Sequence, residues 1–317
     1  MALITGPPVT LPPSQVPADR IRGHGLQSQA SVTTEADNAP PGQRIAHRGV
    51  QHEVNACGRA ACWSHDCDHT DDKFGDQRGQ DWITTTPFTV YATGPRCSGA
   101  DAIANAQRRA TEYFAATEWT AVEYAVQTGA CGARPYLAGE PDGIDLRIRP
   151  GSGDGYTALA AWRVADTSFA PVTPVGTDPV SPEVALAALE WGMRDYAGPG
   201  VIHAPAWSYP WWRPWLRDAG PRLVTQLGAG WALGRGYVSV APGTDPDEMP
   251  SLDDIPDFAS VWLYATGAVR IWRSAVDMTP QYAAYDYRDN RSMMLVERAY
   301  TVSIQCPYIA VNVQLGQ

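Results

Sequence analysis

The residues best suited to metal or redox chemistry cluster between Cys57 and His69. Three thiols (Cys57, Cys62, Cys67) and two imidazoles (His65, His69) lie within this short stretch. Such a density of thiolates and imidazoles can hold a tetrahedral Zn²⁺. The spacing matches no recognised zinc finger, because there is no Cys-x2-Cys pair. Free thiols, or a Cys57 to Cys67 disulfide formed in an oxidising medium, remain open alternatives, and we assign neither a metal nor a cofactor.

Other polar features do not combine into a catalytic site. The sequence has no Gly-x-Ser-x-Gly motif, which a hydrolase nucleophile elbow requires. The segment Gly151–Gly155 lacks the Gly-Lys-Ser/Thr ending of a phosphate loop and is interpreted as a flexible turn. His203 follows Val201 and Ile202 in an apolar run, which favours a hydrogen-bonded histidine in a packed region over a general base. We therefore predict no catalytic residues and no enzyme activity.

Two further segments are candidates for binding. Between Asp245 and Asp257 lie six acidic residues and no basic one, without the spacing of an EF-hand, so we expect a solvated loop. Between Trp207 and Trp215 lie four tryptophans and Tyr209, the densest aromatic patch of the chain. Aromatic residues at this density are typical of a core or a protein interface. A platform that stacks a sugar or a base is the alternative.

Two helices carry clear end signals. The first is predicted from an N-cap at Ser98, with Asp101 in the capping-box position, to a C′ glycine at Gly129. Its apolar residues recur at spacings of three and four, so we expect it to pack along one stripe. These residues are Ile103, Ala106, Ala110, Phe114, Thr117, Ala121 and Tyr124. The second helix is predicted from N-cap Ser181 and Pro182 at N1 to Gly198-Pro199.

Most other elements are predicted strands. The segment Trp82–Tyr91, with Pro87 inside it, suits an edge strand or one arm of a long hairpin. Alternating residues over Tyr300–Cys306 and Ile309–Leu315 predict two strands that each bury one face. The turn Thr266-Gly267 between two β-rich runs predicts a hairpin. Shorter strands are expected at Tyr156–Val164, Gly200–Ala204, Leu223–Leu227 and Trp231–Leu233.

Composition limits the class of protein. The chain has 317 residues, 44% hydrophobic and 18% charged, with a net charge of -10, and Lys73 is its single lysine. An acidic balance argues against a general nucleic-acid-binding surface. No stretch approaches the roughly 20 apolar residues of a membrane span. Residues 1–80 show little hydrophobic periodicity and are interpreted as an extended arm that another surface must hold, such as a neighbouring subunit.

Several phrases, in this order, resemble the head proteins of tailed phages that infect actinobacteria. The first of these short segments are Trp82, Pro87–Ala92 and Arg96–Ser98, and they precede an Ala- and Arg-rich helix that ends at Gln127–Gly129. The later segments are Gly200–Pro205, Leu227-Gly228, Tyr264–Val269 and Glu297–Tyr300. The coarse plan also resembles the capsid fold that these phages share with encapsulins. The resemblance covers about Trp82 to Leu315.

This resemblance implies an α+β chain with the tailed-phage major capsid fold. Its parts would be an N-terminal arm, an extended hairpin loop, a long spine helix, a peripheral sheet and an axial domain. We expect the arm at 1–80, the hairpin or edge strand at 81–97, the spine helix and peripheral region at 98–180, the axial domain at 181–260, and antiparallel strands at 261–317.

The implied function is structural. The chain would assemble with itself into hexamers and pentamers of an icosahedral shell, with other head proteins as further candidate partners. The shell would enclose double-stranded DNA without sequence-specific contacts. It would be located in the virion, be assembled in the host cytoplasm, and contact no membrane. The alternatives are an encapsulin-like compartment shell, and a tail or baseplate binding module that uses the Trp207–Trp215 patch.

Overall fold

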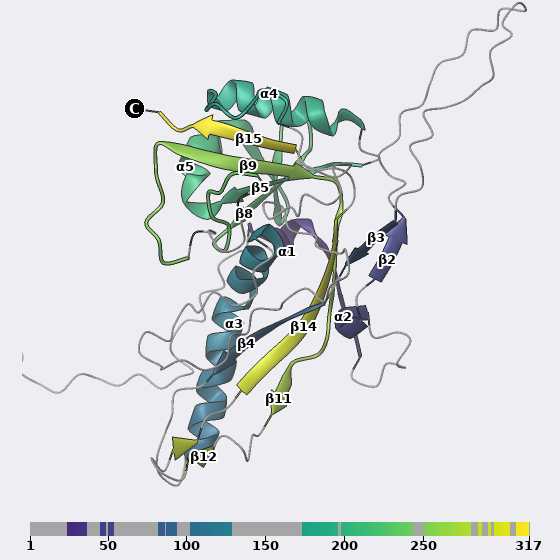
Figure 1. Cartoon of the computed structure of the whole chain (residues 1–317), viewed down its shortest axis with the longest axis vertical. Helices are drawn as coiled ribbons and strands as arrows, with labels where there is room; N and C mark the ends of the chain where they lie inside the picture. The colour runs from purple at the N-terminus through teal and green to yellow at the C-terminus, as the bar shows by residue number, and fades with distance from the viewer. Residues whose placement is uncertain are drawn as a thin grey trace, which may run out of the picture.

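The computed structural model describes about half of the chain. The described residues are 24–36, 45–48, 50–53, 82–85, 87–93, 102–128, 173–195, 198–242, 244, 250, 252–279, 285–286, 291–292, 295–304 and 309–316. Several predicted features lie outside them: the Cys57–His69 cluster, Lys73, the helix caps Ser98 and Gly129, the Gly151–Gly155 turn and the strand Tyr156–Val164. The described part is a mixed α+β structure in which a long helix lies beside two sheets (Figure 1).

The long helix α3 spans Ala102–Thr128. In its first half the buried positions Ala106, Ala110 and Phe114 form the expected stripe. The prediction of a single stripe is wrong for the last two turns, where every residue from Val122 to Thr128 is buried. This end of the helix is covered by both the N-terminal segment and the loop around Gly236, so its polar residues are enclosed as well.

Helix α4 spans Pro182–Gly192 and confirms the predicted start, with Ser181 in the extended N-cap conformation and proline at N1. A 3-10 turn, η4 (Met193–Asp195), follows, so the regular helix ends earlier than the predicted Gly198-Pro199 stop. Ala185 and Leu189 are fully buried in the same core cluster as Val311 of the neighbouring sheet. No helix in the described ranges is long and apolar enough to cross a membrane.

A six-stranded sheet lies next to α4, with strand order β15-β9-β5-β8-β7-β6. The central pair β5 and β8 is parallel and the other neighbours are antiparallel. The strands are β5 (Val201–Pro205), β6 (Leu216–Ala219), β7 (Arg222–Thr225), β8 (Gly230–Gly234), β9 (Ser260–Thr266) and β15 (Ile309–Gln314). All residues of β5 are buried, as predicted for a short buried strand.

A five-stranded sheet is organised around the ten-residue strand β14, which pairs with β10 and β11 and also with β4. The fifth strand, β1, lies parallel to β10 at the edge. The bounds are β1 (Ser31–Thr34), β4 (Phe88–Thr93), β10 (Val269–Arg273), β11 (Asp277–Thr279) and β14 (Leu295–Ile304). Two further pairs are β2 (Val50–Glu53) with β3 (Trp82–Thr85), and β12 (Tyr285–Asp286) with β13 (Arg291–Ser292).

The chain passes between the two large sheets three times: from β4 to β5, from β9 to β10 and from β14 to β15. The predicted hairpin around Thr266-Gly267 is therefore wrong, because β9 pairs with β5 and β15 whereas β10 pairs with β1 and β14. A turn signal shows that the direction changes, but it does not show which strands then pair.

The two C-terminal strands are confirmed, and more of each is buried than the one face that the alternation predicted. Both are buried on both faces over most of their length. The alternating polar residues are accommodated by hydrogen bonds: Thr301 Oγ1 donates to the carbonyl of Ile45 (2.9 Å), in α2 (Ile45–Arg48), and Asn312 Nδ2 donates to that of Thr177 (3.1 Å). Polar alternation here marks side chains that donate hydrogen bonds to the main chain inside the protein rather than side chains in water.

The N-terminal segment is held by its own chain. Helix α1 (Leu26–Gln29) lies against the six-stranded sheet, where Gln29 Nε2 donates to the carbonyls of Leu223 and Trp231, both at 3.1 Å. The N–H of Leu233 donates to the carbonyl of His24 at 2.7 Å. A neighbouring subunit is thus not required to order residues 24–34. The strand β3 pairs with β2, as expected for one arm of a hairpin, and β4 joins the five-stranded sheet after Pro87.

Candidate functional site

His203 is a packed histidine, as the sequence predicts. Its Nδ1 lies 2.8 Å from the Tyr237 hydroxyl and its Nε2 lies 2.8 Å from Thr266 Oγ1, and only 1% of the residue is exposed. Burial lowers the pKa of His203 from 6.5 to about 3, so the ring is neutral at physiological pH. Both ring nitrogens are occupied by neighbouring hydroxyl groups, which leaves no nitrogen free to act on a substrate in this arrangement.

The aromatic patch divides into a buried centre and a partly exposed rim. It covers three short turns: η5 (Ala206–Ser208), α5 (Tyr209–Trp212) and η6 (Arg213–Trp215). Trp212 is fully buried, lies 5.3 Å from Trp231 between ring centroids, and donates from Nε1 to Ser208 Oγ at 2.9 Å. Trp207 packs edge-on against Phe258 at 5.3 Å. The patch is therefore mainly part of the core of the six-stranded sheet, which agrees with the interpretation as core or interface.

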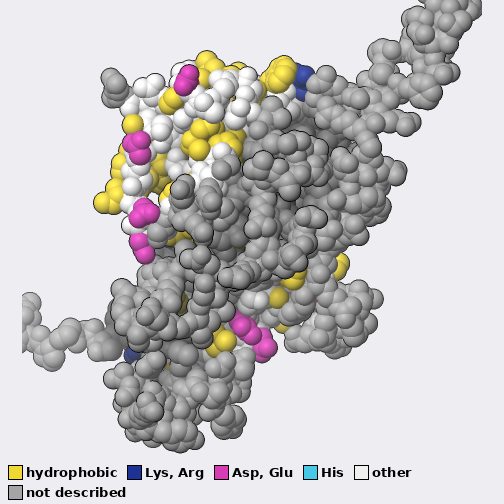
Figure 2. All heavy atoms as spheres, viewed as in Figure 1, with side chains coloured by type: hydrophobic (Ala, Val, Ile, Leu, Met, Phe, Trp, Pro, Cys, Tyr) yellow, Lys and Arg dark blue, Asp and Glu magenta, His cyan; other side chains and the backbone are white. Residues whose placement is uncertain are grey.

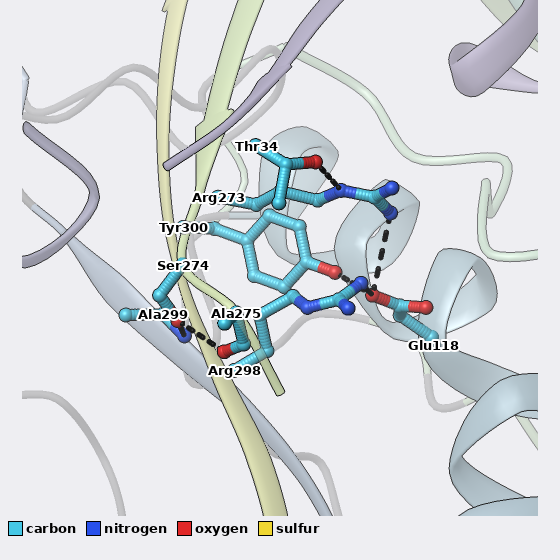
Figure 3. Close-up of polar contacts among 8 residues, drawn as sticks. All are labelled: Thr34, Glu118, Arg273, Ser274, Ala275, Arg298, Ala299 and Tyr300. Atoms are coloured by element: carbon cyan, nitrogen blue, oxygen red, sulfur yellow. Dashed lines mark hydrogen bonds and ion pairs between the residues drawn. The ribbon is translucent and has the colours of Figure 1, made fainter. Parts of the chain in front are cut away.

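A charged cluster connects α3 to the five-stranded sheet. The Glu118 carboxylate accepts a hydrogen bond from the Tyr300 hydroxyl, forms an ion pair with Arg298, and lies 3.7 Å from the Arg273 guanidinium. Figure 3 shows both arginines and the tyrosine converging on this one carboxylate, with Arg273 Nε also donating to Thr34 Oγ1 at 2.9 Å. The cluster thus joins α3 to β14, β10 and β1.

Aromatic rings enclose the same cluster. Tyr300 stacks on Phe88 with ring centroids 5.6 Å apart and meets Trp119 edge-on at 6.4 Å. The Arg273 guanidinium lies 5.8 Å from the Trp119 ring centroid. Burial, with the nearby Glu118 carboxylate, raises the pKa of Tyr300, so the hydroxyl stays protonated and remains a donor. Both arginines and the tyrosine hydroxyl are directed at the one Glu118 carboxylate, which indicates a fastening role.

The last turns of α3 hold a second polar junction. Glu123 Oε1 accepts from the N–H of Leu26 at 2.9 Å, and Oε2 accepts from the N–H of Gly236 at 3.1 Å. One turn later, Gln127 pairs with both backbone groups of Val238, each at 2.6 Å. The helix end therefore binds the N-terminal segment and the loop that follows β8 through main-chain groups.

The sequence predicted a buried role for neither of the two carboxyl groups of α3, those of Glu118 and Glu123. Glu118 occurs four residues after Phe114 on the predicted apolar stripe, and an acid at such a position is a signal of a buried pair. Glu123 carries no such signal, because it lies off the predicted stripe and becomes buried only when α1 covers it.

The described part of the chain contains no group of three or more metal-ligating side chains. Within the described residues of the acidic loop, Asp253, Asp254 and Asp257 are exposed, and Asp257 Oδ1 accepts from the N–H of Ala259 at 2.9 Å. An open groove at the end of β15 is lined by side chains that carry no ionisable group: Ser181, Pro182, Trp211, Gln314, Leu315 and Gly316. Among the described residues, neither place combines a nucleophile with a neighbouring base.

The exposed surface mixes apolar and acidic side chains. Figure 2 shows both kinds gathered along one rim of the part that holds the six-stranded sheet and α4. Large apolar side chains are unusually exposed near these elements: Ile255 at 88%, Leu227 at 81%, Trp191 at 58% and Phe258 at 52%. Isolated exposed apolar residues are ordinary in soluble proteins, but several on one unit are typical of surfaces that contact other proteins.

Comparison with known proteins identifies the fold. No protein-family model and no curated protein matches the sequence. Among solved structures, the capsid of Ralstonia phage GP4 is similar over 100% of this chain and 98% of that chain, with a TM-score of 0.50 at 10% identity. The capsid of an empty GTA particle (92% and 90% covered, TM-score 0.47, 14% identity) and a structure from Mycobacterium phage Ogopogo (92% and 92%, TM-score 0.43, 15% identity) are also similar. The chain has the α+β fold of a phage capsid protein.

Proposed function

We propose that this chain is the structural subunit of a tailed-phage capsid and assembles with copies of itself into the icosahedral shell. The observation that supports the proposal most is the end-to-end similarity to the GP4 capsid, which covers 98% of that chain. The interior polar clusters are consistent with it, because Glu118 and Glu123 join structural elements instead of lining a pocket. A structural, non-enzymatic role fits both features.

The parts of the fold can then be assigned. In this proposal α3 is the spine helix, the five-stranded sheet is the peripheral sheet, and the six-stranded sheet with α4 is the axial domain. The β2 and β3 pair forms the base of the extended hairpin. In sequence, we propose the arm at 1–80, the hairpin region at 81–97, the spine and peripheral region at 98–180, the axial domain at 181–260 and the closing strands at 261–317.

The axial domain would form the centre of each ring of subunits, six in a hexamer and five in a pentamer. Exposed Ile255 and Leu227, on loops of the six-stranded sheet, would be covered by a neighbouring copy there. Other head proteins would join the finished shell in the virion after assembly in the host cytoplasm. A net charge of -10 suits a wall that encloses double-stranded DNA without binding it tightly.

Electron microscopy of the purified full-length chain, together with sedimentation velocity, tests the proposal. We expect closed shells or rings of five or six subunits, empty or filled with DNA. A folded chain that stays monomeric at every concentration, judged by sedimentation and cooperative unfolding, would contradict it. Shells that contain a co-purified enzyme and no DNA would favour an encapsulin-like compartment instead.

A further inference from the structure

Glu123 occupies a junction of three segments that are distant in sequence. Its two oxygens bind the N–H of Leu26 (2.9 Å) in α1 and the N–H of Gly236 (3.1 Å) in the loop after β8. Only 3% of the residue is exposed. One carboxyl group on α3 therefore holds the N-terminal segment and a loop of the six-stranded sheet in place at the same time.

The backbone around Glu123 is shaped to fit this side chain. A Cβ atom on Gly25 would overlap Oε1, and one on Gly234 would come within 2.5 Å of Oε2. A Cβ on Gly236 would overlap the carbonyl oxygen of Thr120, one turn earlier in α3. Glycines on both docked segments are thus required for the close approach of the main chain to the carboxyl group.

No cation contacts this carboxyl group among the described residues. Arg235 acts on Glu123 electrostatically from an exposed side chain without forming an ion pair with it, and its backbone N–H also faces the carboxyl. A carboxylate buried without an ion-pair partner loses its hydration with little compensation. Two or three backbone N–H groups offset part of this cost, but the loss of hydration outweighs them and raises the pKa of Glu123 from 4.5 to about 7.

The other ionisable groups around the junction come from the loop after β8, from β5 and from the start of the N-terminal segment. From the loop after β8 come Arg235 and Tyr237, and burial raises the pKa of Tyr237 well above its usual 10. Behind Tyr237 lies His203 of β5, which burial keeps neutral. Residues 25–30 and the strand β8 carry no ionisable side chain, and His24 immediately precedes them.

We propose that Glu123 is a proton-controlled latch: the neutral carboxyl keeps residues 24–30 and the loop 235–238 docked on α3, and ionisation loosens them. The direction of the pH dependence follows from the difference in proton binding between the docked and the open state. Opening exposes Glu123 to water, where its pKa returns toward 4.5, so opening releases a proton between about pH 4.5 and 7. The latch is therefore tightest in mild acid and weakens as the pH rises to 7, above which it stays constant. This behaviour belongs to a single chain and does not depend on shell assembly.

Amide hydrogen exchange of the unassembled full-length chain at pH 5 to 8, corrected for the intrinsic exchange rates, measures the latch. The informative amides are those of Ala30, bonded to the Leu26 carbonyl, and of Leu233, bonded to the His24 carbonyl. We expect their opening equilibrium to rise up to about tenfold per pH unit between pH 5 and 7 and to level off above. Peptides from β14, in the other sheet, serve as the internal reference and should change less.

Three variants make the test specific. Glu123→Gln should remove the pH dependence at residues 24–30 because the amide does not ionise. His24→Gln, which removes the other ionisable side chain beside the segment, should keep it. Gly25→Ala places a Cβ against Oε1 and should leave the segment open at every pH while the rest of the chain stays folded.

The proposal is overturned if the wild-type protection of residues 24–30 is flat between pH 5 and 7. It is equally overturned if the wild-type dependence survives in Glu123→Gln or disappears in His24→Gln. Should Glu123→Gln fail to fold, the wild-type profile together with His24→Gln and Gly25→Ala still decides the outcome.

Discussion

The carboxylate of Glu118 in α3 forms an ion pair with the guanidinium of Arg298 in β14, 180 residues further along the chain. The side chains are only 9% and 12% exposed, respectively, and the Tyr300 hydroxyl donates to the same carboxylate oxygen. Because β14 pairs with three other strands, this contact fixes the long helix against the whole five-stranded sheet.

Replacing Glu118 by glutamine should destabilise the chain by about 3–5 kcal/mol, because it leaves two arginines in a largely buried site without their carboxylate. Urea unfolding of the unassembled chain measures the change. The matched control is Glu112→Gln on the same helix, whose partner Arg108 is exposed, and it should cost no more than about 0.5 kcal/mol. Equal losses in the two variants would mean that the Glu118 cluster contributes nothing special.

Gly236→Ala should destabilise the chain by about 3 kcal/mol, the upper end of the usual cost of overpacking, because the added methyl group meets backbone atoms of Thr120 and Tyr124. Backbone atoms of a helix cannot move aside as a side-chain end can. Gly198→Ala, where the space is open, should change the thermal midpoint very little. A neutral Gly236→Ala would show that the loop does not approach α3 this closely.

His203 should make the chain less stable in acid. Its folded-state pKa of about 3 lies below the usual 6.5, so the unfolded chain binds a proton that the folded chain does not. The contribution of His203 is complete above about pH 6.5 and falls by up to about 1.4 kcal/mol per unit as the pH drops toward 3. Glu123 contributes a pH dependence of stability with the opposite sign. The effect of His203 is therefore measured as the difference between wild type and His203→Gln in the slope of stability against pH.

In that comparison, urea midpoints at several pH values between 3 and 8 should show a flatter acid limb for His203→Gln, even though the variant is less stable at neutral pH. Tyr237→Phe removes a hydrogen-bond partner but keeps the imidazole, so it should retain the wild-type slope. Parallel curves for wild type and His203→Gln would contradict the assignment of a buried neutral ring.

Trp212→Ala should cost about 3–5 kcal/mol, since the ring is fully buried and its N–H is bonded to Ser208. Trp191→Ala, on the 58% exposed ring that lies under Arg194, should cost less than about 1 kcal/mol. Denaturant unfolding of both variants checks the difference. If Trp212→Ala kept full stability and instead abolished binding to a glycan array, the aromatic patch would be a binding platform rather than core.

Local signals explain which parts of the fold were predictable. Pro182 after Ser181 marked the start of α4, and alternation marked the two C-terminal strands, because each signal depends on neighbouring residues alone. The resemblance carried by short phrases pointed to the capsid fold that the comparison with solved structures then showed. Pairing partners were not predictable in this way, so β9 and β10 were expected to form a hairpin but separate into different sheets.

The sequence by itself determined the two longest described helices, most of the strands, the acidic balance and the packed environment of His203. Only the tertiary structure decided that residues 24–30, whose composition suggested an unsupported arm, dock on their own chain, and that Glu118 and Glu123 face inward to meet Arg298 and Leu26. The physical reason is that burial depends on what covers a residue. For these two carboxyl groups the covering elements lie 180 and 97 residues away in the sequence, beyond the reach of any local pattern.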